Sequence, residues 1–371
     1  MNEKVMPLPA VSGGVSEVSK NEASFGEYNP KRFIFVFMDL NNKCNLRCRM
    51  CHFSHDLKSV PSVTMSLKLF EKIAEQVFPK ATQINLSCGA EPLIIPDFHD
   101  YLRIVKKYRV PVVGIVTNGT KLNEAIITAM LETDVTNIEI SIDGATKETY
   151  EKIRCGANFE KVTKNISLLQ DMKKRAGRRI PCLHLNYTLM RSNLYEFPEF
   201  LRLSKRLNAD SVRATHLIPF KSLNIINESL GLYREETNKV LNESRSLAKE
   251  LGLSVIMPLN FDLNKQESKE LLFNKPNCRI PNFSLCIISD GRVIPCAWFP
   301  LKEWCVGNFQ IQNFDEIWHG EIYKKLREQF KLSIYPDDCK NCPVWGDEIL
   351  QNYSFVEKER KDVFNFSPDP V

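Results

Sequence analysis

Apolar runs that suit buried strands alternate with helical patterns from about residue 33 to residue 217, and this alternation constrains the fold most strongly. The six strand candidates are 33–39, 83–87, 112–117, 137–142, 182–189 and 211–217. The helical patterns between them are 65–78, 97–108, 121–132, 146–175 and 194–207. Alternation of this kind gives a parallel sheet covered by helices, and right-handed crossovers curl such a sheet into a barrel. We therefore predict an α/β fold with a partial (β/α)6 barrel of the TIM type.

The chain has 371 residues, with 43% hydrophobic and 26% charged side chains, which is ordinary for a globular protein. No apolar run approaches the roughly 20 residues of a membrane helix, and residues 1–28 lack a signal-peptide layout. We therefore expect a cytoplasmic protein without a membrane partner. A net charge of +5 is too small to demand a nucleic-acid partner.

Changes in composition divide the chain into five parts. Residues 1–30 are rich in Ser, Gly, Glu and Asn and predict a flexible tail. The barrel core then covers 31–218, and a helical connector covers 219–275, with a long helix over 233–251. A cysteine-rich domain at 276–346 and a C-terminal tail at 347–371 complete the prediction.

Three cysteines lie on one short loop directly after the first predicted strand. Cys44, Cys48 and Cys51 are spaced C-x3-C-x2-C. Three thiolates cannot close the four-coordinate shell of a structural zinc ion. A 4Fe–4S cluster held by three cysteines keeps one iron open for another ligand. The alternative is a zinc knuckle or cysteines without a shared role.

This strand, loop and spacing resemble the signature of the radical S-adenosylmethionine (radical SAM) enzymes. In that family the amino and carboxylate groups of SAM chelate the open iron. The resemblance therefore implies a 4Fe–4S cluster on Cys44, Cys48 and Cys51, with SAM as its ligand. One residue departs from the pattern, because Met50 stands where the family usually has an aromatic residue.

Further stretches that resemble family motifs follow the second, third and fourth predicted strands. Ser87 to Pro92 resembles the Gly-Gly-Glu-Pro stretch that contacts the SAM amino group, with Ala90 in place of the second glycine. The resemblance implies SAM contacts from these residues and from three later positions, and a contact between an arginine and the SAM carboxylate. The expected SAM-binding residues are Gly89, Glu91, Asn118, Ser141, Asp143 and Arg154. Simpler interpretations are a turn at Gly89, a helix cap at Asn118 and a surface position for Arg154.

A second group of cysteines resembles the C-terminal SPASM or twitch domain of many radical SAM enzymes. An apolar run over 284–289, an Asp-Gly turn and Val293-Ile294 predict a β-hairpin within this group. The resemblance implies one auxiliary 4Fe–4S cluster, and Cys286 is the alternative to the first of its ligands. The expected ligands are Cys278, Cys296, Cys339 and Cys342. The alternative is a four-cysteine zinc ribbon.

The resemblance implies reductive cleavage of SAM to a 5′-deoxyadenosyl radical, with electrons from a donor such as flavodoxin or ferredoxin. The first hypothesis is an oxidoreductase or epimerase acting on a small sugar-like or cyclitol-like molecule. Cys88, beside the predicted mouth, is then the candidate hydrogen-atom donor. The first alternative is a maturase of a ribosomally made peptide, and the second is a zinc-binding interaction module without catalysis. Serine-oxidising relatives have an Asp at the position of Ala297, so we do not expect that reaction.

Residues that end the fifth and sixth predicted strands face the same mouth. These are Leu189 to Asn193 and Arg213 to His216, and we expect substrate contacts among them.

Overall fold

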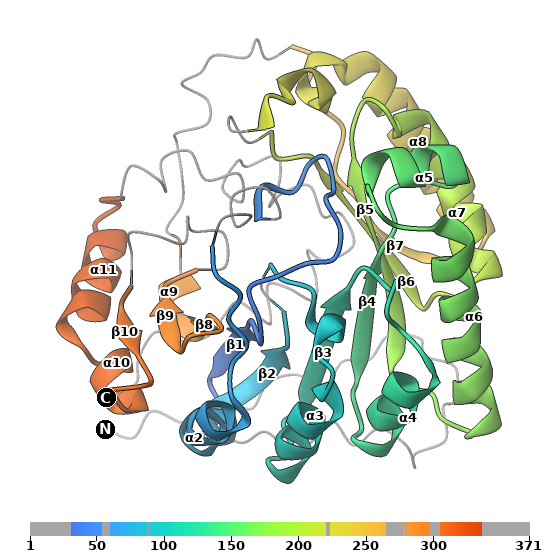
Figure 1. The fold of residues 1–371 in the computed structure, drawn as a ribbon. Coiled ribbons are helices and arrows are strands. Elements are labelled where there is room, and N and C mark those ends of the chain that lie inside the picture. Colours follow the sequence, from blue (N-terminus) through green and yellow to red (C-terminus); the bar gives the residue numbers. More distant parts are fainter. Residues whose placement is uncertain are drawn as a thin grey trace, which may run out of the picture. The chain divides into compact units, whose positions relative to one another are not determined.

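The computed structural model describes residues 31–53, 60–87, 89–219, 223–264, 278, 280–296 and 305–335, all within a unit that begins at Lys31. Within these residues ten strands form one sheet in the order β10-β9-β8-β1-β2-β3-β4-β5-β6-β7 (Figure 1). The strands are β1 (Ile34–Met38), β2 (Ala81–Asn85), β3 (Val112–Thr117), β4 (Asn137–Ser141), β5 (Cys182–Leu189), β6 (Ser211–His216), β7 (Ser254–Ile256), β8 (Ser284–Ile287), β9 (Arg292–Ile294) and β10 (Gly307–Asn308).

Helices α2 to α8 follow one face of this sheet (Figure 1). Alternate strand residues such as Ile138 and Ile140 are fully buried against them, in one continuous core. The α-helices are α2 (Leu67–Val77), α3 (Phe98–Lys107), α4 (Glu124–Glu132), α5 (Lys147–Ile153), α6 (Phe159–Arg175), α7 (Phe197–Arg206), α8 (Arg234–Glu250), α9 (Ile280–Phe283), α10 (Phe314–Trp318) and α11 (Glu321–Lys331). Short 3-10 helices are η1 (Phe78–Lys80), η2 (Pro92–Ile94), η3 (Leu194–Glu196), η5 (Ile226–Glu228) and η6 (Leu230–Leu232).

Strands β1 to β7 are all parallel to their neighbours, which confirms the predicted α/β class with a parallel sheet. Strand β7 was not predicted, because three residues are too few to show a hydrophobic period. It lies with α8 inside 219–275, where we expected a connector, and both continue the β/α alternation. The five-part division of the chain stays a prediction.

The predicted hairpin extends the same sheet. Strand β8 pairs in parallel with β1, and β9 turns back antiparallel to β8. Gly291 in the turn has φ +85°, a backbone conformation that favours glycine. The cysteine-rich region is therefore joined to the first strand of the barrel through main-chain hydrogen bonds.

Two predicted boundaries were wrong. The helix expected over 146–175 is two helices, because the chain breaks at Gly156, whose φ of +92° does not fit a helix. The Asn158 side chain then caps the N-terminus of α6 by accepting from the backbone N–H of Lys161. Strand β2 begins at Ala81 rather than at residue 83.

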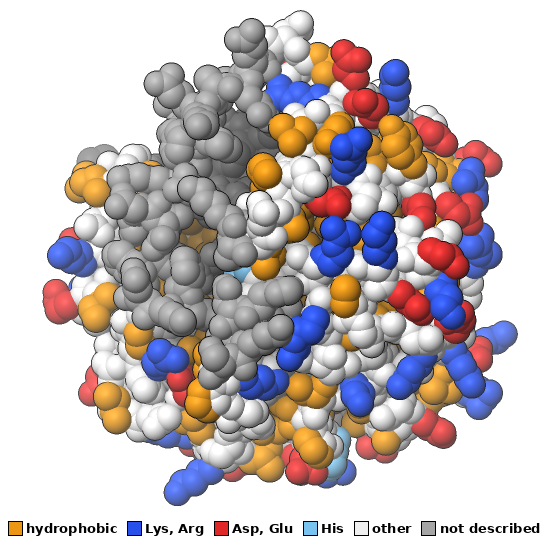
Figure 2. All heavy atoms as spheres, turned by 45° about the horizontal axis from the view of Figure 1, so that its top comes forward, with side chains coloured by type: hydrophobic (Ala, Val, Ile, Leu, Met, Phe, Trp, Pro, Cys, Tyr) orange, Lys and Arg blue, Asp and Glu red, His pale blue; other side chains and the backbone are white. Residues whose placement is uncertain are grey.

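None of the helices in the described ranges combines the length and apolarity needed to cross a lipid bilayer. On the right of the view in Figure 2, Lys and Arg side chains are interspersed with Asp and Glu side chains.

Candidate functional site

The three cysteines of the C-x3-C-x2-C loop lie at the carboxyl end of β1, beside the end of α5. The loop is fixed by backbone bonds from Arg47 N–H to the Cys155 carbonyl and from Arg49 N–H to the Ile153 carbonyl, both 2.9 Å. Chemistry in β/α barrels is built at the carboxyl ends of the strands. The loop therefore occupies the expected end of the sheet.

Two of these thiols, the buried Cys48 and the partly buried Cys44, receive N–H···S contacts. Burial raises the pKa of Cys44 and raises the pKa of Cys48 to about 12. Asn118 Nδ2 lies 3.8 Å from Cys44 Sγ, and Arg154 Nη1 lies 3.9 Å from Cys48 Sγ. Electrostatic repulsion from Cys51 also raises the pKa of Cys44 and of Cys48, so the three thiols lie near one another on the loop. In the described ranges no three Cys, His, Asp or Glu side chains converge as a single metal ion would require.

Asn118 links the cysteine loop to the end of β3. Its Nδ2 donates to Asn45 Oδ1 at 3.0 Å, and its Oδ1 accepts from the Thr120 hydroxyl at 2.6 Å. Asn45 Nδ2 closes the network by donating to the Thr120 hydroxyl at 2.8 Å. Asn118 therefore orients the loop that carries Cys44, and a contact with SAM stays a prediction.

Glu91 is 3% exposed, and its carboxylate accepts three hydrogen bonds from other residues of the protein. Its carboxylate accepts from Leu93 N–H, from the Thr117 hydroxyl at 2.6 Å and from Asn118 N–H at 2.7 Å. Burial raises its pKa, and these three bonds oppose that shift. Glu91 thus joins the loops that follow β2 and β3.

Position 89 requires glycine because the backbone there lies close to an aromatic ring. A Cβ at this position would lie 2.7 Å from Phe53 Cδ2. Its backbone N–H donates to Asp39 Oδ1 at 3.1 Å, and that of Ala90 donates to the same oxygen. Cys88 lies outside the described residues, so its role as a hydrogen-atom donor stays a prediction.

Asp143 and Arg154 form a buried ion pair, with Arg154 Nε 2.7 Å from Asp143 Oδ2. Burial alone would lower the pKa of Arg154, but Asp143 and the Cys48 thiolate raise it, and the net shift is upward. Ser141 is half-buried and makes no side-chain hydrogen bond within the described ranges. The structure therefore brings Asp143 and Arg154 to the cysteine loop, whereas Ser141 keeps its hydroxyl free.

A small pocket lies beside Met50 of the cysteine loop. Arg49 Nη2 and Glu228 Oε1 lie 3.6 Å apart within its lining, and Glu228 also accepts from Ser192 N–H at 2.9 Å. The remaining lining is apolar. The lining residues are Arg49, Met50, Ile153, Met190, Ser192, Ile225 and Glu228.

The described cysteines of the cysteine-rich region pack in two different side-chain clusters. Cys278 and Cys296 are partly buried against the same small cluster, formed by Leu326 and Phe330 of α11. Cys286 is fully buried in a different cluster with Ile288 and Ile294. This arrangement favours Cys278 over Cys286 as the partner of Cys296. Cys339 and Cys342 lie outside the described residues.

Comparison with known proteins identifies the family and its domains. A family model described as the radical SAM superfamily matches residues 38–204, and one described as a SPASM iron–sulfur cluster-binding domain matches residues 278–343. The chain belongs to the radical SAM superfamily. It is an enzyme of that superfamily, and its two domains imply a 4Fe–4S cluster with SAM and auxiliary iron–sulfur binding. The hypothesis of a non-catalytic zinc module is therefore set aside.

Two relatives of this radical SAM enzyme and one solved structure with the same fold are informative. It is 26% identical over 330 residues to the tungsten-containing aldehyde ferredoxin oxidoreductase cofactor-modifying protein of Pyrococcus furiosus, covering 84% of this chain and 87% of that one. It is 27% identical over 350 residues to a cysteine-type anaerobic sulfatase-maturating enzyme of Clostridium novyi, covering 84% and 85%. The structure of Streptococcus suis SuiB bound to the precursor peptide SuiA matches with a TM-score of 0.62 at 14% identity, covering 80% and 67%.

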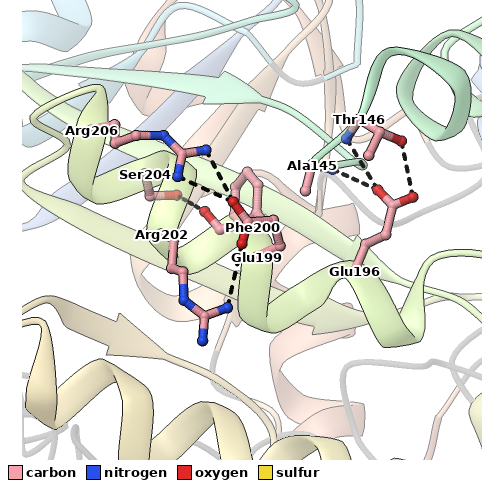
Figure 3. Close-up of polar contacts among 8 residues, drawn as sticks. All are labelled: Ala145, Thr146, Glu196, Glu199, Phe200, Arg202, Ser204 and Arg206. Carbon is pink, nitrogen blue, oxygen red and sulfur yellow. Dashed lines mark hydrogen bonds and ion pairs between the residues drawn. The ribbon is translucent and has the colours of Figure 1, made fainter.

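The sequence analysis of this radical SAM enzyme missed Glu196, which fixes the loop after β4. Its carboxylate accepts from the backbone N–H groups of Ala145 and Thr146 at 2.8 and 3.2 Å (Figure 3). That loop carries Asp143. No local motif marks Glu196, because its partners lie about 50 residues earlier in the chain.

Proposed function

We propose that this radical SAM enzyme is a maturase that modifies a residue within a peptide or protein chain. The observation that carries the proposal is its alignment with the sulfatase-maturating enzyme over 84% of this chain and 85% of that one. A second support is that SuiB, which shares the fold, is solved with a precursor peptide. The sugar or cyclitol substrate expected from the sequence has no counterpart in the names of these relatives.

Cys44, Cys48 and Cys51 would hold the cluster that binds SAM, and three neighbouring thiols that are buried or partly buried suit a group with three thiolate ligands. When bound, the cluster and SAM supply a 5′-deoxyadenosyl radical that removes a hydrogen atom from carbon. The protein's part is to orient these groups and exclude water.

The side chains at the strand ends divide into two roles in this proposal. Glu91, Asn118 and Arg154 are engaged in contacts within the protein, so they position the loops around SAM. Ser141 makes no side-chain hydrogen bond to the part of the chain that the structure describes, so it is the better candidate for a direct SAM contact. Contacts of SAM with Gly89 and Asp143 remain part of the proposal.

Cys278 and Cys296, with Cys339 and Cys342, would hold one auxiliary 4Fe–4S cluster. Four cysteines give such a cluster a complete protein shell. A small reducing protein such as flavodoxin or ferredoxin would supply electrons.

The test uses anaerobically reconstituted enzyme, dithionite, SAM and synthetic peptides encoded beside its gene. We expect peptide-dependent 5′-deoxyadenosine and a mass change in one peptide, both lost when Cys44, Cys48 and Cys51 are replaced by Ala. If no peptide changes mass while a cyclitol or sugar is oxidised or epimerised, the proposal is wrong.

A further inference from the structure

The sheet face that points away from the helices is polar on three neighbouring strands. The interior of a TIM barrel is normally filled by branched apolar side chains. Here the corresponding positions of β4, β5 and β6 are Asn137, Glu139, Ser141, Cys182, His184, Asn186, Thr188, Ser211, Arg213 and Thr215. The Arg213 side chain is 44% exposed and that of Glu139 is 20% exposed. This face is therefore accessible to solvent at the centre of the sheet.

Three of these side chains meet around one carboxylate oxygen. Asn186 Nδ2 donates to Glu139 Oε2 at 2.8 Å, and Arg213 Nη1 lies 3.8 Å from the same oxygen. The carboxylate fixes the orientation of the amide, because a flipped Asn186 would place its carbonyl oxygen against Glu139. The Asn186 Oδ1 atom consequently points elsewhere.

This group has unused hydrogen-bonding capacity. Asn186 Oδ1 is buried and has no partner within the described ranges, and Glu139 Oε1 also accepts no hydrogen bond there. Arg213 has five N–H donors, and among the residues that the structure describes it makes only the long contact with Glu139. On β2, the same face carries Asn85, which is 7% exposed and has an unpartnered Oδ1. A buried polar atom without a partner is costly, so these atoms call for a ligand or ordered water.

The neighbours of this group define its position. His184 is already held by Ser211 Oγ at 2.7 Å and by Asn137 Oδ1 at 3.3 Å, and burial lowers its pKa. In the sheet register Asn186 lies opposite Ser141 on one side and Arg213 on the other. The group therefore lies next to the strand end where Ser141 is proposed to contact SAM.

We propose that Glu139, Asn186 and Arg213 bind a main-chain peptide group of the substrate. A peptide group offers one N–H and one C=O. Its N–H donates to Asn186 Oδ1 or Glu139 Oε1, and its C=O accepts from Arg213. The charges of the Glu139 carboxylate and the Arg213 guanidinium cancel. The site therefore has no net charge, which favours a neutral peptide group over an anion. This inference rests on the proposed function and names the part of the substrate that this face of the sheet holds.

The test measures binding by saturation-transfer NMR on the reconstituted enzyme with SAM and no reductant, so that no turnover occurs. The probes are N-acetylglycine N-methylamide, alanine and myo-inositol, which present an uncharged peptide group, a zwitterion and a polyol. We expect the methylamide to bind, and Arg213→Met to raise its dissociation constant about tenfold, the effect of losing a hydrogen bond to a charged group. Arg206→Met, which removes an exposed arginine paired with Glu199 on α7, is the matched control and should bind as wild type (Figure 3).

Glu139→Gln gives a second readout that does not depend on folding defects, because the side chain keeps its shape. The charge of Arg213 then lacks its partner, and preference should shift from the methylamide toward the N-acetylglycine anion. The proposal is overturned if the methylamide does not bind, binds equally to Arg213→Met, or is displaced by alanine or myo-inositol. A maturase that modifies its peptide normally after Arg213→Met would overturn only this subsite. Probe binding without any peptide product would instead count against the proposed function.

Discussion

Arg154 and Asp143 form an ion pair that joins the end of α5 to the end of β4, beside Cys48. Their side chains are 11% and 0% exposed. Asp143 Oδ1 also accepts from Thr188 N–H at 2.6 Å, so the pair reaches β5 as well. Because Arg154 Nη1 contacts Cys48 Sγ, the pair also holds Cys48, a proposed cluster ligand, in place, and Asp143 compensates the charge of Arg154.

Asp143→Asn should destabilise the protein by about 3–5 kcal/mol, since it leaves the Arg154 guanidinium buried without its counter-charge. The measurement is the thermal unfolding midpoint of the reconstituted enzyme, together with iron per chain. Lys147→Met is the control, because the Lys147–Glu160 pair is exposed and its loss should leave the midpoint unchanged. Equal midpoints for Asp143→Asn and wild type would show that the pair has no structural role.

Glu196 and Glu199 lie one turn apart and offer a matched comparison (Figure 3). Glu196→Gln loses acceptors for the loop after β4, including the Thr146 and Thr149 hydroxyls, and should cost about 1–2 kcal/mol. Glu199→Gln loses only exposed contacts to Arg202 and Arg206. We expect slower substrate-free formation of 5′-deoxyadenosine in Glu196→Gln alone. Similar rates in both variants would mean that the loop does not depend on Glu196.

The hydrophobic period predicted most of the barrel because each strand from β1 to β6 is long enough to show it. Strand β7 has only three residues, so no period could reveal it. The parallel pairing of β8 with β1 could not be predicted either, because it joins Phe35 to Ser284 across about 250 residues. Local patterns carry no information about such distant pairing.

The cysteine motif predicted where the site lies, but spacing could not show which hydrogen bonds its neighbours make. Glu91 and Arg154 were expected to contact SAM, and the structure occupies both with partners inside the protein. Those partners come from other strands and are invisible to a local motif. The polar positions of β4, such as Glu139, were visible in the sequence. Whether these polar side chains face the core or solvent depends on which face of the sheet the helices cover, and the sequence does not show this.

His216 was expected among the substrate contacts, and the structure stacks it on Phe261 instead, with ring centroids 4.8 Å apart. Both ring nitrogens are buried and lack partners within the described ranges. Burial lowers the pKa of His216 to about 4. Between that value and the ordinary value of 6.5 the unfolded chain binds more protons, so stability rises with pH through this window.

His216→Phe should therefore raise the thermal midpoint, and its advantage over wild type should grow by about 2 kcal/mol between pH 7 and pH 5. The stacking on Phe261 is retained, while the two unpartnered nitrogens are removed. His99→Phe, at an exposed position on α3, is the matched control for the change from histidine to phenylalanine. A loss of peptide modification in His216→Phe with an unchanged midpoint would instead assign His216 to the substrate.

Cys278 and Cys286 can be distinguished by iron content. Two 4Fe–4S clusters give roughly eight irons per chain. Cys278→Ala should reduce this to roughly four, because Cys278 and Cys296 share the cluster of side chains around Leu326 and Phe330. Cys286→Ala should keep the full iron content, since this thiol is packed with Ile288 and Ile294, away from that group. Iron lost from Cys286→Ala and retained in Cys278→Ala would reverse the assignment. The radical SAM cluster supplies an internal reference, because neither change affects Cys44, Cys48 or Cys51 and substrate-free cleavage of SAM should persist in both variants.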